Sequence, residues 1–269
     1  MDKKYSRRGF ITLSGLVGLI PSAISNPMTS AAISKSAKPS KNAVFVPDLK
    51  KIKELISRAD PSIWLFTGDS ITHGAKHTHG WRSYPEIFAE RIRWELGRTR
   101  DIIINTGISG NICDDILEDF EWRVAQFKPS MASVMIGTND CVRTSISTEH
   151  FKNKLTLLVS RIRQLNAIPV LHTPNFLDIA QAPHCKRLPE FVTVTRDVAQ
   201  ELKTVLVDNW SYWQRAASGD QPQNELYKAW LADPVHPNNQ GHSQIAQLLF
   251  KSFEIFDEKS SACQDLLNR

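Results

Sequence analysis

The sequence predicts an α/β domain in which helices cover both faces of a central parallel sheet of five strands, a three-layer α/β/α sandwich. Two observations support this fold. Short apolar runs recur without the polar–apolar alternation of half-exposed strands, and amphipathic helical patterns separate them. Continuous apolar strands are typical of sheets buried on both faces. Strands and helices in alternation, joined by right-handed crossovers, predict a doubly wound sheet that binds ligands beyond the carboxyl ends of its strands.

The expected strands lie at residues 62–67, 101–105, 132–136, 168–172 and 204–207. Each of the first three is followed by a turn that contains glycine. Between the strands, residues 84–96 and 148–165 place apolar side chains three and four positions apart, as in a helix with one buried face. Residues 239–256 predict a last helix packed on the sheet.

Composition and charge exclude several classes of protein. The 269 residues include 41% hydrophobic and 23% charged residues, a globular balance that excludes a disordered chain. The net charge of +5 is concentrated at the N-terminus, because residues 1–32 hold four basic residues and one acidic residue. The remainder has 29 basic against 27 acidic residues and no basic stripe, so we expect no nucleic-acid partner.

The N-terminus has the pattern of a targeting segment. A basic stretch ending at Arg8 precedes an apolar run over residues 10–20, which Pro21 ends. This run is short for a membrane span but suits a signal peptide. Ser6–Ile11 resembles a twin-arginine export signal, with an ordinary secretory signal or an uncleaved membrane anchor as the alternatives. We therefore expect recognition by the twin-arginine export machinery and a periplasmic or secreted protein.

The expected boundaries follow from these patterns. We predict a signal peptide at 1–32, a Lys/Ser/Pro linker at 33–50, a folded domain at 51–259 and a tail at 260–269. The sequence leaves the oligomeric state open. Four cysteines without a C-x-x-C pair exclude a zinc ribbon or a thioredoxin-like site, and their disulfide pairing also stays open. They are Cys113, Cys141, Cys185 and Cys263.

Polar, turn-forming residues gather at the predicted strand ends. Gly68-Asp69-Ser70 follows the first strand, Gly107–Asn111 the second and Gly137–Asp140 the third. A fourth segment, Asp233–Pro237, precedes the last helix and places an Asp three residues before a His. Together these segments supply a nucleophile, a base, an orienting carboxylate and hydrogen-bond donors for an oxyanion, which is the set that acyl transfer needs.

These ordered blocks resemble the SGNH or GDSL hydrolases, a family of serine esterases and lipases with a flavodoxin-like α/β/α fold. Gly68–Ile71 corresponds to the nucleophile block, with Ile in place of the family's Leu. The glycine block is at Gly110, the asparagine block at Gly137–Asp140 and the acid–base block at Asp233–Pro237. Any one block alone would be a common turn, but four in this order predict a catalytic site.

The residue chemistry predicts a role for each member. Ser70 needs a base to remove its proton, and His236, the only His in a D-x-x-H spacing, can act as that base. Asp233 would orient the imidazole and stabilise its charged form. The resemblance implies that the backbone N–H groups of Ser70 and Gly110 and the side-chain amide of Asn139 form the oxyanion hole. We read Asp69 and Asp140 as supporting carboxylates outside the triad.

The predicted reaction is hydrolysis of a short-chain ester, acetyl on a carbohydrate being the first choice, with no cofactor and no metal. Lysophospholipase or thioesterase activity is the alternative within the family, and a non-catalytic carbohydrate-binding module is the alternative outside it. The sequence lacks the G-x-S-x-G elbow of α/β-hydrolases and the glycine loops of nucleotide-binding proteins.

The segment after the nucleophile suggests a substrate-binding loop. His73, His77 and His79 could bind a metal, but no carboxylate or cysteine lies in register with them, so we expect a polar loop lining the pocket instead. We predict that His73, Trp81 and Arg82 contact a small-molecule or glycan ester; packing and surface roles are the alternatives for Trp81 and Arg82.

Overall fold

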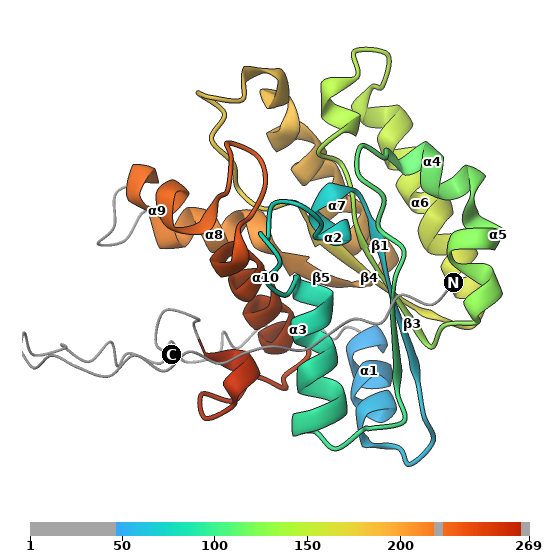
Figure 1. Ribbon diagram of the computed structural model, residues 1–269. Helices are drawn as coiled ribbons and strands as arrows, with labels where there is room; N and C mark the ends of the chain where they lie inside the picture. Colours follow the sequence, from blue (N-terminus) through green and yellow to red (C-terminus); the bar gives the residue numbers. More distant parts are fainter. Residues whose placement is uncertain (1–46, 218–222, 265–269) are drawn as a thin grey trace, which may run out of the picture. The chain divides into compact units, whose positions relative to one another are not determined.

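A five-stranded sheet forms the centre of the computed structural model of the protein, and every strand pair in it is parallel (Figure 1). The strand order is β2-β1-β3-β4-β5, which confirms the predicted doubly wound sheet. The chain reverses its winding direction beside β1, so a crevice is expected at the carboxyl ends of β1 and its neighbours. The strands are β1 Ile63–Gly68, β2 Ile102–Asn105, β3 Met131–Met135, β4 Ile168–Thr173 and β5 Val205–Asp208.

The helices alternate with these strands along the chain. The α-helices are α1 Pro47–Ser57, α2 Ser70–His73, α3 Tyr84–Glu90, α4 Cys113–Glu118, α5 Phe120–Arg123, α6 Thr148–Gln164, α7 Leu188–Leu202, α8 Asn209–Ala217, α9 Gln223–Trp230 and α10 Asn239–Ser252. A π-helical turn, Arg91–Glu95, continues α3, and short 3₁₀ turns occur at Ala125–Phe127, Asp140–Val142, Pro183–Cys185 and Ser261–Cys263.

The structure describes residues 47–217 and 223–264, which belong to one compact unit, Val44–Arg269. The expected signal peptide and nearly all of the expected linker lie outside the described residues. Helix α1 begins at Pro47, inside the predicted linker, and the turn at Ser261–Cys263 buries side chains inside the predicted tail. Ordered structure thus extends beyond the predicted limits of 51 and 259. None of the described helices is both long and apolar enough to cross a membrane.

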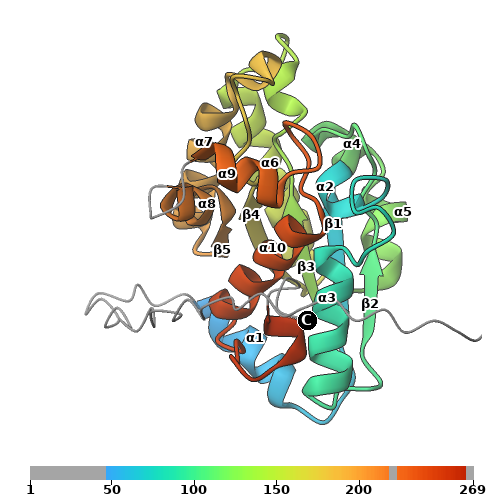
Figure 2. The ribbon, with the colours of Figure 1, turned by 60° about the vertical axis from the view of Figure 1, so that its left-hand side comes forward.

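Two apolar cores fill the space between the sheet and its helical layers. Neighbouring residues of β1 contribute to opposite sides, with Leu65 in the core beneath α4, α6 and α7 and Phe66 in the core beneath α3 and α10 (Figures 1 and 2). The Phe66 ring meets that of Phe88 edge to face, with centroids 5.1 Å apart. All four cysteines lie in the described part of the chain, are buried and form no disulfide.

Gly68 ends β1 where the chain turns into the nucleophile block. A Cβ at this position would lie 2.2 Å from the backbone oxygen of Met135 on β3, so the two strands would have to separate. We expect Gly68→Ala to lower the free energy of unfolding by about 3 kcal/mol through overpacking.

Gly97→Ala is the matched control for this substitution. Gly68 has a φ of 159° and Gly97 a φ of 69°, but a Cβ added at Gly97 would meet nothing within 4 Å. We expect it to cost about 1 kcal/mol of backbone strain alone. Urea unfolding of both variants measures the difference, and equal losses would contradict the steric account.

Candidate active site

Ser70 lies at the first position of α2, directly after β1. Asp69 is the N-cap of this helix, and its Oδ1 accepts the backbone N–H of Ile71 at 2.9 Å. The N–H groups in the first turn of a helix have no intrahelical acceptor, so the N–H of Ser70 is available to a ligand. The strand thus delivers Ser70 to the carboxyl edge of the sheet, and the cap fixes its orientation.

The loop that carries His236 folds around a carboxylate. Oδ1 of Asp233 accepts the backbone N–H groups of Val235 at 2.9 Å and of His236 at 2.8 Å. The Nδ1 atom of His236 lies 2.9 Å from Oδ2 and 3.0 Å from Oδ1 of the same carboxylate. Partial burial opposes ionisation of Asp233, but the backbone donors and the imidazole outweigh it and hold the pKa of Asp233 below its usual range.

The imidazole of His236 contacts Ser70, a residue distant from it in the sequence. Nε2 of His236 lies 2.9 Å from Oγ of Ser70, although 166 residues separate them in the chain. This distance is that of a hydrogen bond, and the two nitrogen atoms of one ring connect Ser70 with Asp233.

The glycine and asparagine blocks contact each other. Asn139 follows β3, and its Nδ2 donates to the backbone oxygen of Asn111 at 3.1 Å, one residue after Gly110. One hydrogen of that amide is left over for a substrate. Gly110 has a φ of 86° and is exposed, a conformation that glycine adopts without strain.

Arg123 organises this corner, and the sequence analysis did not single it out. Its side chain is fully buried, and Nη2 donates to the backbone oxygens of Gly68 at 3.2 Å and Thr106 at 2.9 Å, while Nη1 donates to Oδ1 of Asn111 at 2.5 Å. The guanidinium thereby joins the ends of β1 and β2 to the loop that positions Asn139. A basic residue between the apolar Phe120 and Val124 was the available signal.

Two buried carboxyl groups, those of Asp69 and Asp140, adjoin Ser70 and Asn139 in the chain. Burial raises the pKa of Asp69 to about 7, with the nearby Asp140 adding to the shift, and burial likewise raises the pKa of Asp140 to about 6. Oδ1 of Asp140 accepts the N–H of Cys113 at 2.9 Å. Among the described residues, Oδ2 of each carboxyl and the hydroxyl of Thr138 lack a well-directed partner. A neutral acid is therefore favoured here.

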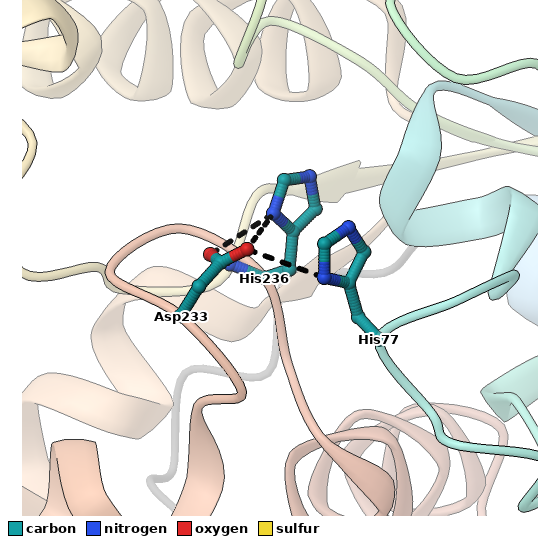
Figure 3. A group of neighbouring side chains, drawn as sticks. All are labelled: His77, Asp233 and His236. Carbon is teal, nitrogen blue, oxygen red and sulfur yellow. Dashed lines mark hydrogen bonds and ion pairs between the residues drawn. The ribbon is translucent and has the colours of Figure 1, made fainter.

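The histidine that ends α2 and the two in the segment after it separate in the structure. Nδ1 of His73 lies 3.0 Å from Oγ of Ser109, and His79 is exposed. His77 instead lies against His236 and Asp233, as Figure 3 shows. No signal in the sequence distinguished His77 from its two neighbours.

Trp81 and Arg82 do not join this group. The Trp81 side chain is 60% exposed, and Arg82 forms an ion pair with Glu90 of α3 at 3.2 Å. Within the described part of the chain, neither forms a hydrogen bond or ion pair with Ser70, Asp233 or His236. Their role in substrate binding, like that of His73, stays a prediction.

The sequence profile of the GDSL-like lipase/acylhydrolase family matches residues 66–244. The chain belongs to this family. The match contains Ser70, His236 and all the blocks described above, and the protein is a carboxylic ester hydrolase of the SGNH type.

The chain is also similar to individual proteins. The hydrolase is 27% identical over 206 residues to an acetylxylan esterase of Geobacillus stearothermophilus, covering 70% of this chain and 91% of that one. It is 26% identical over 192 residues to the uncharacterised lipoprotein YqeF of Bacillus subtilis, covering 62% and 78% of the two chains. Its fold matches LAE5, an α/β hydrolase from the metagenome of Lake Arreo, with a TM-score of 0.64 and 23% identity over 76% of this chain and all of that one.

Replacing Arg123 of the hydrolase with Met should destabilise the fold and the site together. The change leaves Thr106 O and Asn111 Oδ1 without their donor, whereas Gly68 O keeps the N–H of Ile108 at 3.0 Å, and each orphaned acceptor costs about 1–3 kcal/mol. We expect the free energy of unfolding to fall by about 3 kcal/mol in urea titrations, with reduced esterase turnover. Arg93→Met, at an exposed position, is the control, and equal stability of the two variants would refute the role of Arg123.

Asp69 should make stability depend on pH. Its folded pKa of about 7 exceeds the ordinary value of 3.8, so folding favours the protonated form and the stability it provides is lost as the pH rises from 4 through 7. Asp69→Asn keeps the capping oxygen but cannot ionise. The variant should gain stability relative to the natural protein by a few kcal/mol across this range, because a tenfold change in proton affinity corresponds to about 1.4 kcal/mol.

Urea unfolding at pH 4.5 and pH 7.5 measures this gain. Asp119→Asn, at an exposed carboxylate, is the control that should show none. A constant stability difference between Asp69→Asn and the natural protein at the two pH values would contradict the buried neutral acid.

Proposed function

We propose that the protein hydrolyses short-chain acyl esters, acetyl groups on carbohydrates in particular, through an acyl-enzyme on Ser70. One observation carries the proposal. The imidazole of His236 lies within 2.9 Å of both Oγ of Ser70 and the carboxylate of Asp233. That arrangement suits removal of the serine proton and stabilisation of the resulting imidazolium, and the family's ester hydrolase activity requires such a nucleophile.

In the proposed acylation step, Oγ of Ser70 attacks the ester carbonyl while Nε2 of His236 takes its proton. The carbonyl oxygen becomes an oxyanion, which accepts hydrogen bonds from the N–H groups of Ser70 and Gly110 and from Nδ2 of Asn139. The intermediate then collapses, the bond to the alcohol oxygen breaks, and the imidazolium returns its proton to that oxygen. The alcohol leaves and the acyl group stays on Ser70.

Deacylation repeats these steps with water. His236 removes a proton from a water molecule that attacks the acyl carbon, and the same donors hold the second oxyanion. Cleavage of the acyl–Oγ bond returns the proton to Ser70 and releases the carboxylic acid. Asp233 stays ionised throughout, consistent with the lowered pKa that its hydrogen bonds produce.

A cavity beside Asp233 offers hydrogen-bonding groups to a carbohydrate alcohol. It has a volume of about 530 Å³, and its lining combines the polar side chains of Asp178, Gln181 and Lys228 with apolar ones such as Leu231 and Pro234. A sugar ring presents hydroxyl groups and apolar C–H faces, so this mixed lining suits it. The acetylxylan esterase of Geobacillus stearothermophilus, by its name, acts on an acetylated glycan, in the same direction as this proposal.

Export is part of the proposal. The twin-arginine-like segment at Ser6–Ile11 would direct the chain across a membrane, where extracellular glycans are within reach. The similarity to a lipoprotein of Bacillus subtilis supports a location outside the cytoplasm.

Replacing Ser70 with Ala tests the nucleophile. We expect kcat for p-nitrophenyl acetate to fall at least about 1000-fold, because no other group can form the acyl-enzyme. A serine-directed phosphonate should label Ser70 in the natural protein and leave the folded Ala variant unlabelled. A folded natural protein that neither reacts with the phosphonate nor turns over any ester would instead favour a carbohydrate-binding module.

A series of p-nitrophenyl esters from C2 to C12, run beside acetylated xylo-oligosaccharides, tests the substrate class. The highest kcat/KM should fall at C2, and acetate should be released from the oligosaccharides. A maximum at C8 or beyond would overturn the acetyl proposal in favour of a lipolytic enzyme. Activity lost on chelation would contradict a mechanism without metal.

A further inference from the structure

The loop between α2 and α3 places a second imidazole on the proposed triad. The rings of His77 and His236 are parallel within 1°, with centroids 3.8 Å apart, and Nδ1 of His77 lies 3.2 Å from Oδ2 of Asp233 (Figure 3). One carboxylate therefore receives two imidazoles, from residues 159 positions apart in the chain.

Turns within the loop hold His77 in this place. Its backbone N–H donates to the oxygen of Ala75 at 2.8 Å, and the buried hydroxyl of Thr78 donates to the oxygen of Gly74 at 2.9 Å. The N–H of Trp81 closes a further turn on Thr78 at 3.0 Å. The ring of His77 keeps only 19% of its side-chain surface exposed, so it forms a cover over the face of His236.

The protonation state of His77 suits a hydrogen-bond donor. Partial burial, together with the charge of His236, lowers the pKa of His77, so the ring is neutral near pH 7. Because Nδ1 faces a carboxylate that can only accept, the neutral ring carries its proton there. His77 then donates to Oδ2 of Asp233 without placing a second positive charge against His236.

The imidazoles of His77 and His236 and the carboxylate of Asp233 are also groups that bind transition metals. Their ligand atoms lie within 4.8 Å of one another. The ring geometry opposes this use. An imidazole binds a metal in its own plane at about 2.0–2.1 Å, and the in-plane lone pairs of two face-to-face rings run parallel and do not converge on one point. Stacking and metal binding therefore exclude each other here, and the structure has the stack.

We propose that His77 is a positioning residue of the esterase, which holds the Asp233 carboxylate with its Nδ1–H and holds the His236 ring by stacking on it. This inference rests on the proposed function of Ser70, His236 and Asp233. The base must keep one ring orientation while its Nε2 atom gains and returns a proton. A neutral ring against one face and a second donor on its carboxylate restrict both rotation of His236 and displacement of Asp233.

Three substitutions separate the two contacts. His77→Ala removes both the donor and the ring. His77→Asn places an amide N–H near the position of Nδ1 and keeps the donor, whereas His77→Phe keeps a stacking ring and loses the donor. His79→Asn is the matched control in the same loop, because His79 is exposed and has a φ of 51°, which Asn tolerates.

We expect His77→Ala to lower kcat for p-nitrophenyl acetate about 10-fold with KM little changed, and the Asn and Phe variants to retain more activity than the Ala variant. The acid limb of the kcat/KM profile should move to higher pH in the Ala and Phe variants. In these variants the Asp233 carboxylate no longer accepts a hydrogen bond from residue 77, so it stabilises the protonated ring of His236 more strongly. The limb should stay in place in the Asn variant. His79→Asn should behave as the natural protein.

Other titratable and charged groups near His77 can also affect the pH profile. Besides His236 and Asp233, these are Lys76 and His79 on its own loop and His242 on α10, whose pKa burial lowers to about 3 so that it stays neutral in the assay range. The control at His79 and a further Lys76→Met variant account for the loop charges.

Unchanged kcat and acid limb in all three variants would overturn the inference. A loss of kcat with no shift of the limb, equal in all three, would overturn it too, since that result fits a loop with a structural role alone. If Ser70→Ala retains esterase activity, the proposed function itself fails. If Ser70→Ala is inactive while the His77 variants match the natural protein, only the role of His77 fails.

Discussion

The hydrogen bond between Ser70 and His236 depends on a constraint of parallel sheets: all strands end at the same edge. β1 delivers Ser70 there, and its neighbours β2 and β3 deliver Gly110 and Asn139. The histidine comes from a loop anchored at both ends. The N–H of Ala232 donates to the oxygen of His236 at 2.9 Å, and the side chain of Asn238 caps α10. The packing of α10 on the sheet thus sets the distance between His236 and Ser70.

Three buried ionisable side chains, Arg123, Asp69 and Asp140, lie next to the residues of the site. Arg123 brings a full charge into the interior, where backbone oxygens and an amide oxygen are its hydrogen-bond acceptors. Asp69 and Asp140 are buried carboxyl groups whose pKa values burial raises. Such groups cost free energy on folding but fix loops that apolar packing would leave loose. The site therefore exchanges some stability for fixed positions of Ser70 and Asn139.

Asp233 connects the loop geometry with the chemistry. Its Oδ1 atom accepts two backbone N–H groups and so shapes its own loop, while Oδ2 faces the imidazoles of His236 and His77. Pinning of the loop to the segment after β4 adds rigidity, since the N–H of Asp178 donates to the oxygen of Pro234 at 3.0 Å. The carboxylate consequently has little freedom to move as the charge on His236 changes.

The sequence by itself determined the five strands, the parallel sheet and the order of the four blocks, because continuous apolar runs and glycine turns are local patterns. It also predicted that Ser70, Gly110 and Asn139 lie at one edge, since strand ends in such a sheet converge, whereas the place of Asp233 and His236 beside them was implied by the resemblance of the ordered blocks. Tertiary structure alone decided the contacts of Arg123 and His77. Burial of a guanidinium depends on which carbonyl oxygens surround it, and only folding of the loop could single out His77 from His73 and His79 by placing it on a residue 159 positions away.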